Sequence, residues 1–280
     1  MNSCMFSNRG LTKFLLYGML LFYILTTWTT PGFAITWGNE DTENIYSNVG
    51  VLIVSVPETG VFPVCSGTLI HESVVLSAGH CTSSLEPLLD ADEIEVYVCF
   101  DFDPYTEGAR WIKVEAISTH PEYNDFRPRS NIHDVGVLIL EEPVMDISPA
   151  VLPNEGFLDE LRDENKLRQG SKGAKLIVVG YGGALEWPPP VIIYDSRRRF
   201  AESEYQTLLK SWLRLSQKQA TGDGGTCYGD SGGPAFWTEP NGIQILVGIT
   251  SWGDAVCVAS GFNYRVDIQE TLDFISSVIQ

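Results

Sequence analysis

Residues 227–234 read CYGDSGGP, a run in which a serine lies between glycines and directly after an acid. Glycines at this density allow a tight backbone turn that another segment can approach closely. Such a turn can leave the amide N–H groups of Gly229 and Ser231 pointing at one spot beside the Ser231 hydroxyl, where they would stabilise an anionic oxygen. The run indicates a serine nucleophile, with a plain glycine-rich hairpin as the alternative.

A serine hydroxyl becomes a good nucleophile only when a base takes its proton, so the four histidines are informative. His80 follows an apolar run that begins near Val74, and a strand end there would hold the imidazole in place. His71 and His120 lie in polar, turn-like contexts and are expected on the surface. We therefore expect His80 to be the general base.

The base needs a carboxylate to orient it. Asp134 opens the apolar segment DVGVLIL at 134–140, and an acid that leads into such a strand is expected to be partly buried. Buried carboxylates need partners, and a histidine N–H is a natural one. An aspartate that caps a strand turn is the alternative, and His133 would then simply flank it. The order His80, Asp134, Ser231 favours the catalytic interpretation.

Six segments carry a resemblance to one protein family. They look like the signature sequences of the chymotrypsin-like (trypsin-fold) serine proteases, and the similarity runs from about residue 35 to the C-terminus. In one-letter code the segments are CSGTLI (65–70), SAGHC (77–81), HDVGVL (133–138), VGYG (179–182), GDSGGP (229–234) and SWG (251–253).

The resemblance implies a mechanism that the residue chemistry also permits. Ser231 would attack the scissile carbonyl, His80 would take its proton and later give it to the leaving amine, and Asp134 would fix the imidazole tautomer. The amides of Gly229 and Ser231 would hold the oxyanion, and Ser251 would hydrogen-bond Asp134. The implied activity is that of a serine-type endopeptidase that forms an acyl-enzyme.

The resemblance also places the primary specificity pocket. Gly225 would form its base, and Gly253 and Gly261 would form its walls. An acid at the base would indicate cleavage after Lys or Arg, so a glycine predicts large apolar or aromatic side chains at P1, the residue before the cut. Basic specificity is the alternative if Asp223 or Asp254 reaches into the pocket.

The other expected substrate contacts follow from the same resemblance. Thr226 follows the base of the pocket. The backbone of Ser251, Trp252 and Gly253 would pair with an extended substrate as an added strand. The expected substrates are therefore proteins or peptides.

Short β-branched segments recur between turn signals and predict an all-β protein. The fold we expect is two six-stranded antiparallel Greek-key β-barrels with a C-terminal α-helix, with His80 and Asp134 on the first barrel and Ser231 on the second. The segments read as strands are 49–56, 73–77, 94–100, 111–117, 135–140, 176–179, 244–250 and 261–266. The predicted boundaries are a signal peptide at 1–34, the first barrel at 35–155, a connection at 156–170, the second barrel at 171–266 and the helix at 267–280.

The first residues have the features of a secretory signal. Arg9 and Lys13 precede an apolar core at about 14–25, and the small residues Gly32 and Ala34 suit cleavage after Ala34. An uncleaved membrane anchor is the alternative, but the core is shorter than the roughly 20 apolar residues that a bilayer needs. We expect a secreted protein, extracellular or periplasmic, without stable membrane association after cleavage.

Cleavage after Ala34 would expose Ile35, and ITWG at 35–38 resembles the family's mature start Ile-Val-Gly-Gly. In the family the freed ammonium pairs with the acid before the nucleophile, here Asp230, and this ion pair shapes the oxyanion hole. A basic activation site does not precede Ile35. We therefore expect export itself to create the active N-terminus.

Five cysteines follow the predicted signal, which fits an oxidising compartment. Sequence alone leaves their pairing open. The resemblance implies the disulfides Cys65–Cys81 and Cys227–Cys257 and leaves Cys99 unpaired. A buried thiol is then expected, with a bridge to another chain as the alternative.

The formal net charge is −18, and it becomes about −20 once Arg9 and Lys13 are removed. Such acidity argues against nucleic acid and anionic membranes as partners. We expect a monomer with no cofactor. We also expect no metal, because the acidic runs at 89–93 and 101–103 lack the glycine-hinged spacing of a calcium loop. RRR at 197–199 is interpreted as an isolated basic patch.

Two other classes of function are weighed. A catalytically inactive relative that serves as a binding module usually lacks a triad member or an oxyanion glycine, and none is missing here. A general esterase usually has a serine separated from each flanking glycine by one residue, a spacing that GDSGG at 229–233 does not keep.

Overall fold

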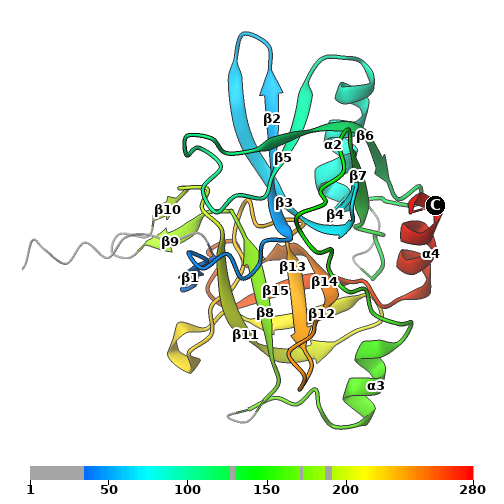
Figure 1. Cartoon of the computed structure of the whole chain (residues 1–280). Helices are drawn as coiled ribbons and strands as arrows, with labels where there is room; N and C mark the ends of the chain where they lie inside the picture. Colours follow the sequence, from blue (N-terminus) through cyan, green and yellow to red (C-terminus); the bar gives the residue numbers. More distant parts are fainter. Residues whose placement is uncertain (1–34, 127–129, 171–172, 187–190, 280) are drawn as a thin grey trace, which may run out of the picture. The chain divides into compact units, whose positions relative to one another are not determined.

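The computed structural model describes residues 35–126, 130–170, 173–186 and 191–279. The predicted signal peptide lies outside the described residues. Strands are the main regular structure of the described chain and form two closed six-stranded antiparallel barrels, which confirms the predicted fold (Figure 1).

The first barrel closes through the strand order β2-β3-β4-β7-β6-β5, with β5 paired back to β2. Its strands alternate in burial where one face meets the core. In β6, for example, Ile112 and Val114 are buried while Lys113 and Glu115 are exposed. The strands are β2 (Val49–Val56), β3 (Gly60–His71), β4 (Val74–Ser77), β5 (Glu95–Cys99), β6 (Trp111–Thr119) and β7 (Gly136–Leu140).

The second barrel repeats this topology. Its order is β8-β11-β12-β15-β14-β13, and β13 pairs back to β8 to close the barrel. When the six strands of each barrel are numbered along the chain, both barrels have the spatial order 1-2-3-6-5-4. The short β1 (Asn39–Glu40) extends β11, and β9 (Ala184–Glu186) pairs with β10 (Val191–Ile193) as a separate hairpin. The barrel strands are β8 (Lys175–Gly180), β11 (Arg199–Leu208), β12 (Trp212–Ser216), β13 (Pro234–Thr238), β14 (Gln244–Gly253) and β15 (Ser260–Arg265).

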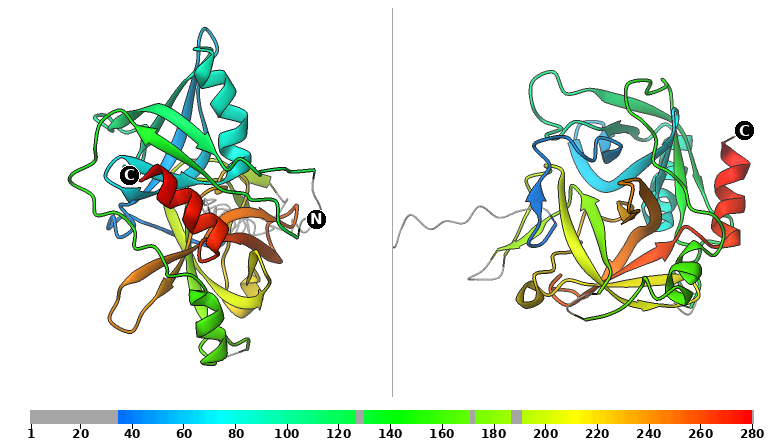
Figure 2. Two further views of the ribbon diagram at one scale, coloured as in Figure 1. Left: turned by 90° about the vertical axis from the view of Figure 1, so that its right-hand side faces the viewer. Right: turned by 60° about the horizontal axis from the view of Figure 1, so that its bottom comes forward.

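Three α-helices accompany the described strands: α2 (Gly79–Asp90), α3 (Phe157–Asp163) and α4 (Gln269–Val278). The C-terminal helix α4 lies at one side of the barrels (Figure 2) and buries Phe274 and Ile275 in the same apolar cluster as the first-barrel core. Within the described residues, none of the helices combines the length and the apolar character that crossing a bilayer requires.

The predicted surface position of His120 is wrong. Its side chain is buried, stacks on the ring of His133 with the centroids 4.6 Å apart, and lies 5.1 Å from the ring of Phe274 on α4. Burial lowers the pKa of His120 below its ordinary value, and the neighbouring His133 adds to this effect. The turn-like sequence around His120 carries no sign that a helix from the far end of the chain will cover it.

The predicted basic patch at 197–199 is also wrong for two of its three arginines. Arg198 is fully buried, and its Nε donates to Asp41 at 2.8 Å. Its Nη1 donates to the carbonyl oxygens of Val49 and Phe100 at 3.1 and 2.7 Å, so an arginine before β11 holds the edge of the first barrel. Arg199 is likewise buried and pairs with Glu40 at 2.7 Å. Removing one partner of such a buried pair typically costs about 3–5 kcal/mol.

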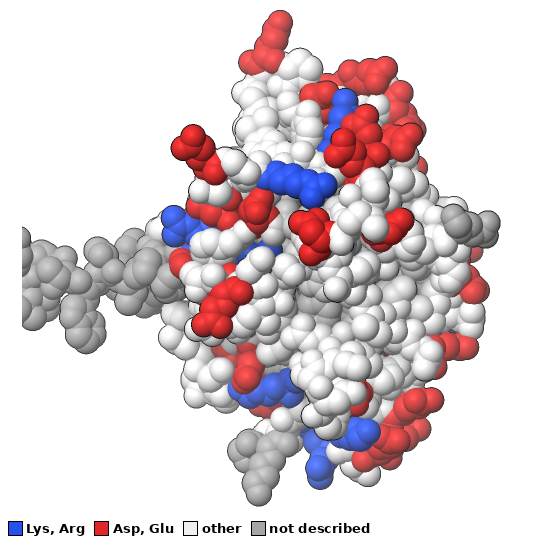
Figure 3. Space-filling view, viewed as in Figure 1, with Lys and Arg blue, Asp and Glu red and all other residues white. Residues whose placement is uncertain are grey.

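The remaining charge is distributed as the acidic composition implies. On the face shown in Figure 3, acidic side chains gather over the first barrel and along the lower right edge, and basic ones are scattered between them. A surface of this kind repels the phosphate backbone of nucleic acids.

Candidate active site

The three predicted triad residues lie in three separate segments of the two barrels. His80 is the second residue of α2, directly after β4, and Asp134 stands just before β7. A Cβ added at Gly79 would lie 2.9 Å from the nitrogen of Val135, so a glycine at this position lets α2 begin close to the Asp134 loop. Ser231 lies in the loop before β13 of the second barrel.

His80 and Asp134 form a close pair. Nδ1 of His80 lies 3.0 Å from Oδ2 of Asp134, and the His80 backbone N–H donates to Oδ1 at 2.8 Å. A register irregularity in β14 occurs at Ser251, whose hydroxyl donates to Oδ2 of Asp134. The predicted base, its carboxylate and the expected supporting serine are therefore in contact.

This contact sets the charge state of the pair. Burial alone would lower the pKa of His80, but the hydrogen bond and the charge of Asp134 outweigh it and hold the pKa above its ordinary value. Burial alone would raise the pKa of Asp134, but hydrogen bonds from His80 and Ser251 hold it below its ordinary range. At neutral pH the carboxylate is ionised and favours a proton on the imidazole nitrogen that faces it.

Backbone contacts hold Ser231 against the first barrel. Its carbonyl accepts the N–H of Ser66 at 2.7 Å, and the next amide, Gly232, donates to Thr250 at 2.8 Å. Gly232 has φ 82°, and a Cβ there would lie 3.0 Å from the nitrogen of Ala78, two residues before His80. Ser231 and Ser251 line one cavity of about 220 Å³.

The hydrogen bonds of two neighbouring carbonyls fix the directions of the Gly229 and Ser231 N–H groups. The Tyr228 carbonyl accepts the N–H of Gly183 at 2.7 Å, and the Asp230 carbonyl accepts that of Gly233 at 2.9 Å. In a trans peptide the N–H points opposite to the C=O, so the amides of Gly229 and Ser231 turn away from those partners. Neither amide has an acceptor in the part of the chain that the structure describes. An oxyanion hole requires amide donors that are uncommitted in this way.

Sequence reasoning missed one supporter of this loop. The hydroxyl of Ser66 donates to the Gly229 carbonyl at 3.2 Å and accepts the N–H of Tyr181 at 3.1 Å. It thus joins β3 to the oxyanion turn and to the end of β8. The CSGTLI segment was the available signal, because its serine lies directly after a disulfide cysteine.

Asp230 is fully buried beside Ile35, which is itself fully buried. Its carboxylate accepts the N–H groups of Cys227 and Gly182, each at 2.8 Å. Burial raises the pKa of Asp230 to about 7, although these hydrogen bonds, the charge of Arg199 and a backbone hydrogen bond from Ile35 lower it. The structure therefore brings together the two residues of the expected activation pair.

Several of the expected substrate-contact residues line the same cavity as Ser231. Thr226, Trp252 and Gly253 line the cavity, and the Trp252 ring stacks on Phe262 with the centroids 3.7 Å apart. Gly225 is buried, and its N–H donates to the Thr36 carbonyl at 2.9 Å.

Both acids that could have given basic specificity already have hydrogen-bond or ion-pair partners within the chain. Asp223 is buried, accepts the Thr221 hydroxyl at 2.7 Å and lies 3.6 Å from the Lys175 ammonium. Asp254 does line the cavity, but its oxygens accept the backbone N–H groups of residues 258–260 at 2.8–3.1 Å. A Lys or Arg side chain in the pocket would have to compete with these partners.

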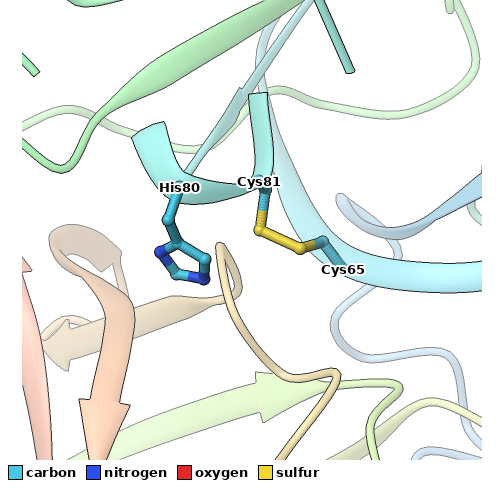
Figure 4. Close-up of side chains that lie close together, drawn as sticks. All are labelled: Cys65, His80 and Cys81. Atoms are coloured by element: carbon cyan, nitrogen blue, oxygen red, sulfur yellow. A yellow bond between two sulfur atoms is a disulfide. The ribbon is translucent and has the colours of Figure 1, made fainter. Parts of the chain in front are cut away.

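Both expected disulfides are present, Cys65–Cys81 and Cys227–Cys257. Figure 4 shows the first beside the His80 imidazole at the start of α2. These three side chains could be grouped as metal ligands, but the two sulfurs are bonded to each other and offer no thiolate. Cys99 is free and fully buried, so its sulfur cannot reach another chain, and burial raises the pKa of its thiol to about 12.

Comparison with known proteins agrees with this geometry. A trypsin family model matches residues 35–275. The chain is 29% identical over 208 residues to serine protease 56 of Mus musculus, covering 70% of this chain and 31% of that protein. It is 25% identical over 218 residues to trypsin 5G1 of Aedes aegypti, covering 75% and 72%. It is 27% identical over 238 residues to vitamin K-dependent protein C of Mus musculus, covering 77% and 46%.

The chain therefore belongs to the trypsin family of chymotrypsin-like serine proteases. It spans less than half the length of two of these relatives, serine protease 56 and protein C.

Proposed function

We propose that the chain is a secreted serine endopeptidase with the triad Ser231, His80 and Asp134. The observation that carries this proposal is the Nδ1–Oδ2 contact of 3.0 Å between His80 and Asp134. It is supported by the amides of Gly229 and Ser231, which have no acceptor among the described residues. An inactive binding module would have no need of that pair, and the glycine spacing around the serine does not fit the usual esterase elbow.

The reaction follows from these positions. Ser231 Oγ attacks the peptide carbonyl as Nε2 of His80 takes its proton, and the new oxyanion is held by the amides of Gly229 and Ser231. The imidazolium, stabilised by Asp134, then protonates the leaving amine, which leaves an acyl-enzyme. Water deprotonated by His80 attacks the ester, and the acid product departs as the proton returns to Ser231.

Proteins or peptides are the proposed substrates. The exposed end of β14, Ser251–Gly253, has backbone groups that an extended chain can pair with as an added strand. Gly225 offers no acid, and Asp223 and Asp254 already have partners, so an uncharged P1 side chain is favoured over Lys or Arg. The large apolar or aromatic preference expected from the sequence further requires that nothing fills the base of the pocket. The predicted signal and the disulfides support secretion.

A fluorophosphonate probe tests the proposal, because it reacts with activated serines regardless of P1 preference. The chain that starts at Ile35 should be labelled at Ser231 and should hydrolyse a denatured protein. Ser276→Ala, which changes an exposed serine on α4, should be labelled equally well, and Ser231→Ala should not be labelled. Absence of label would support a binding module, whereas label with ester cleavage only would support an esterase.

The N-terminal prediction concerns the Ile35–Asp230 pair. A form that keeps one Met before Ile35 should have a kcat/KM at least about 100-fold lower than the form that starts at Ile35, because the oxyanion hole then lacks the ammonium that supports its acid. The pKa of about 7 for Asp230, with only an amide N–H from Ile35, supports a need for that positive charge. Kinetics on the two forms, each confirmed by N-terminal sequencing, measure the difference.

Asp230→Asn supplies the control for this experiment. In the form that starts at Ile35, the substitution should reduce activity to a similar extent. Adding Met to the Asp230→Asn variant should then change little, because the two changes disrupt one interaction and do not add. Full activity of the Met-extended wild type would show that export does not activate the enzyme through this pair.

A further inference from the structure

The deep end of the specificity pocket contains a side chain that the sequence did not assign to it. Gln217 directly follows β12 and is buried. Its backbone N–H donates to the carbonyl of Ala259 at 3.1 Å, which fixes where the side chain starts. Its Nε2 donates to the Thr226 carbonyl at 2.7 Å and lies 3.3 Å from the Thr226 hydroxyl. The carboxamide therefore reaches the residue that lines the cavity.

The space beside two pocket glycines is filled by this side chain. A Cβ added at Gly225 would overlap Cγ of Gln217 and lie 2.7 Å from its Cδ. A Cβ added at Gly261 would lie 2.9 Å from Nε2 of Gln217 and 3.2 Å from the Thr226 hydroxyl. Atoms in ordinary contact stand about 3.5–4.0 Å apart. Gln217 thus occupies the volume that side chains at the base and the wall would otherwise take.

The cavity beside Ser231 is small and ends before the two glycines that Gln217 covers. Its volume is about 220 Å³. Among the described residues its lining reaches Thr226 but neither Gly225 nor Gly261. The lining includes Thr226, Cys227, Ser231, Trp252, Gly253 and Cys257.

The glutamine is not explained by its own hydrogen bonds. Its Nε2 is bound to Thr226, but its Oε1 is buried and has no hydrogen-bond partner within the described chain. An unpaired buried acceptor costs about 1–3 kcal/mol, so a purely structural role would favour an apolar side chain of similar size here. Gln217 instead places a neutral, polar carboxamide at the deep end of the pocket.

We propose that Gln217 is a specificity-determining residue that closes the deep end of the primary pocket, so that the enzyme cleaves after uncharged side chains of intermediate length. Leu, Met and Gln should be accepted, and Tyr, Trp, Lys and Arg should be disfavoured. This rests on the proposed endopeptidase function. It revises the preference for large apolar or aromatic side chains that was expected from Gly225 and Gly261. That expectation took the space between the two glycines to be open. A long cation would meet a carboxamide in place of a carboxylate, and burying it there is unfavourable.

The test is a series of peptides that differ only at P1, with kcat/KM measured for the wild type and for Gln217→Ala. The wild type should prefer Leu and Met to Tyr and Trp by about 10-fold or more, because pocket fit changes rates by about that amount per methylene. Gln217→Ala should raise the Tyr-to-Leu ratio at least about 10-fold. Gln217→Asn, which retains the amide but is one methylene shorter, should move the ratio in the same direction by less. Gln219→Ala, the same change at an exposed residue two positions away, should leave the ratio unchanged.

Active-site titration with a fluorophosphonate distinguishes this proposal from the proposed function. A wild type without label would refute the endopeptidase itself. A labelled wild type that prefers Tyr or Trp would overturn the role of Gln217 without any variant. Labelled Gln217→Ala and Gln217→Asn proteins with the P1 profile of the wild type would overturn it equally. Because only folded active sites are titrated, poor folding of one variant lowers the yield of sites without altering the measured ratio.

Discussion

An alanine in place of Ser231 is expected to lower kcat/KM for a peptide substrate by about 10⁴- to 10⁶-fold. The expected loss is this large because the acyl-enzyme route disappears altogether. What remains is the modest contribution of substrate binding and of the oxyanion amides. The carbonyl of Ser231 still accepts the N–H of Ser66, and the N–H of Gly232 still reaches Thr250, so the loop should keep its shape.

The measurement is steady-state hydrolysis of one peptide by wild type, Ser231→Ala and Ser276→Ala at equal concentrations. Thermal unfolding of the three proteins accompanies it. The two variants make the same chemical change, and only the first removes the proposed nucleophile. Equal midpoints with activity lost in Ser231→Ala alone would support the assignment. An alanine variant that hydrolyses the peptide at the wild-type rate would refute it.

Some of the strands with an apolar core face could be predicted from the sequence, whereas β3, β12 and β13 were not. Segment 49–56 coincides with β2, and β7 and β14 overlap the segments predicted for them. β11 was missed because its inward positions include Arg199, Ala201 and Ser203, which are buried but are not apolar enough to produce a strand pattern. The helix α2 was missed as well, since it contains Pro87 and has weak apolar spacing.

The site residues likewise differ in whether the local sequence could predict them. His80, Asp134 and Ser231 could be proposed because each lies in a segment whose local sequence is unusual. Gln217 could not, because its role depends on the empty space beside glycines at 225 and 261, and a lone glutamine after a short strand carries no signal. The burial of Arg198 likewise depends on Asp41, which is 157 positions away in the chain.

Asp134→Asn is expected to reduce kcat/KM by about 10⁴-fold. An asparagine can present an N–H to Nδ1 of His80, which places the imidazole proton on Nε2 and leaves no lone pair for the Ser231 hydroxyl. The substitution also removes the charge that stabilises the imidazolium. Both effects act on the transition state, so kcat should fall far more than KM rises.

The pH profile gives this prediction a second, independent readout. His80 must be neutral to accept a proton, so kcat/KM rises with pH through the pKa of His80. In the wild type Asp134 holds that pKa above its ordinary value, and the acid limb should lie correspondingly high. Without the carboxylate, burial lowers the pKa, and the residual activity of Asp134→Asn should persist to lower pH.

Asp125→Asn is the matched control for the charge effect. Asp125 also raises the pKa of His80, as the smallest of the contributions, and its side chain is exposed. Water and salt screen such a charge, so this variant should keep nearly the full rate with an acid limb only slightly displaced. If Asp134→Asn kept the acid limb of the wild type, His80 would not be the group that titrates, and the proposed base would have to be sought elsewhere in the cleft.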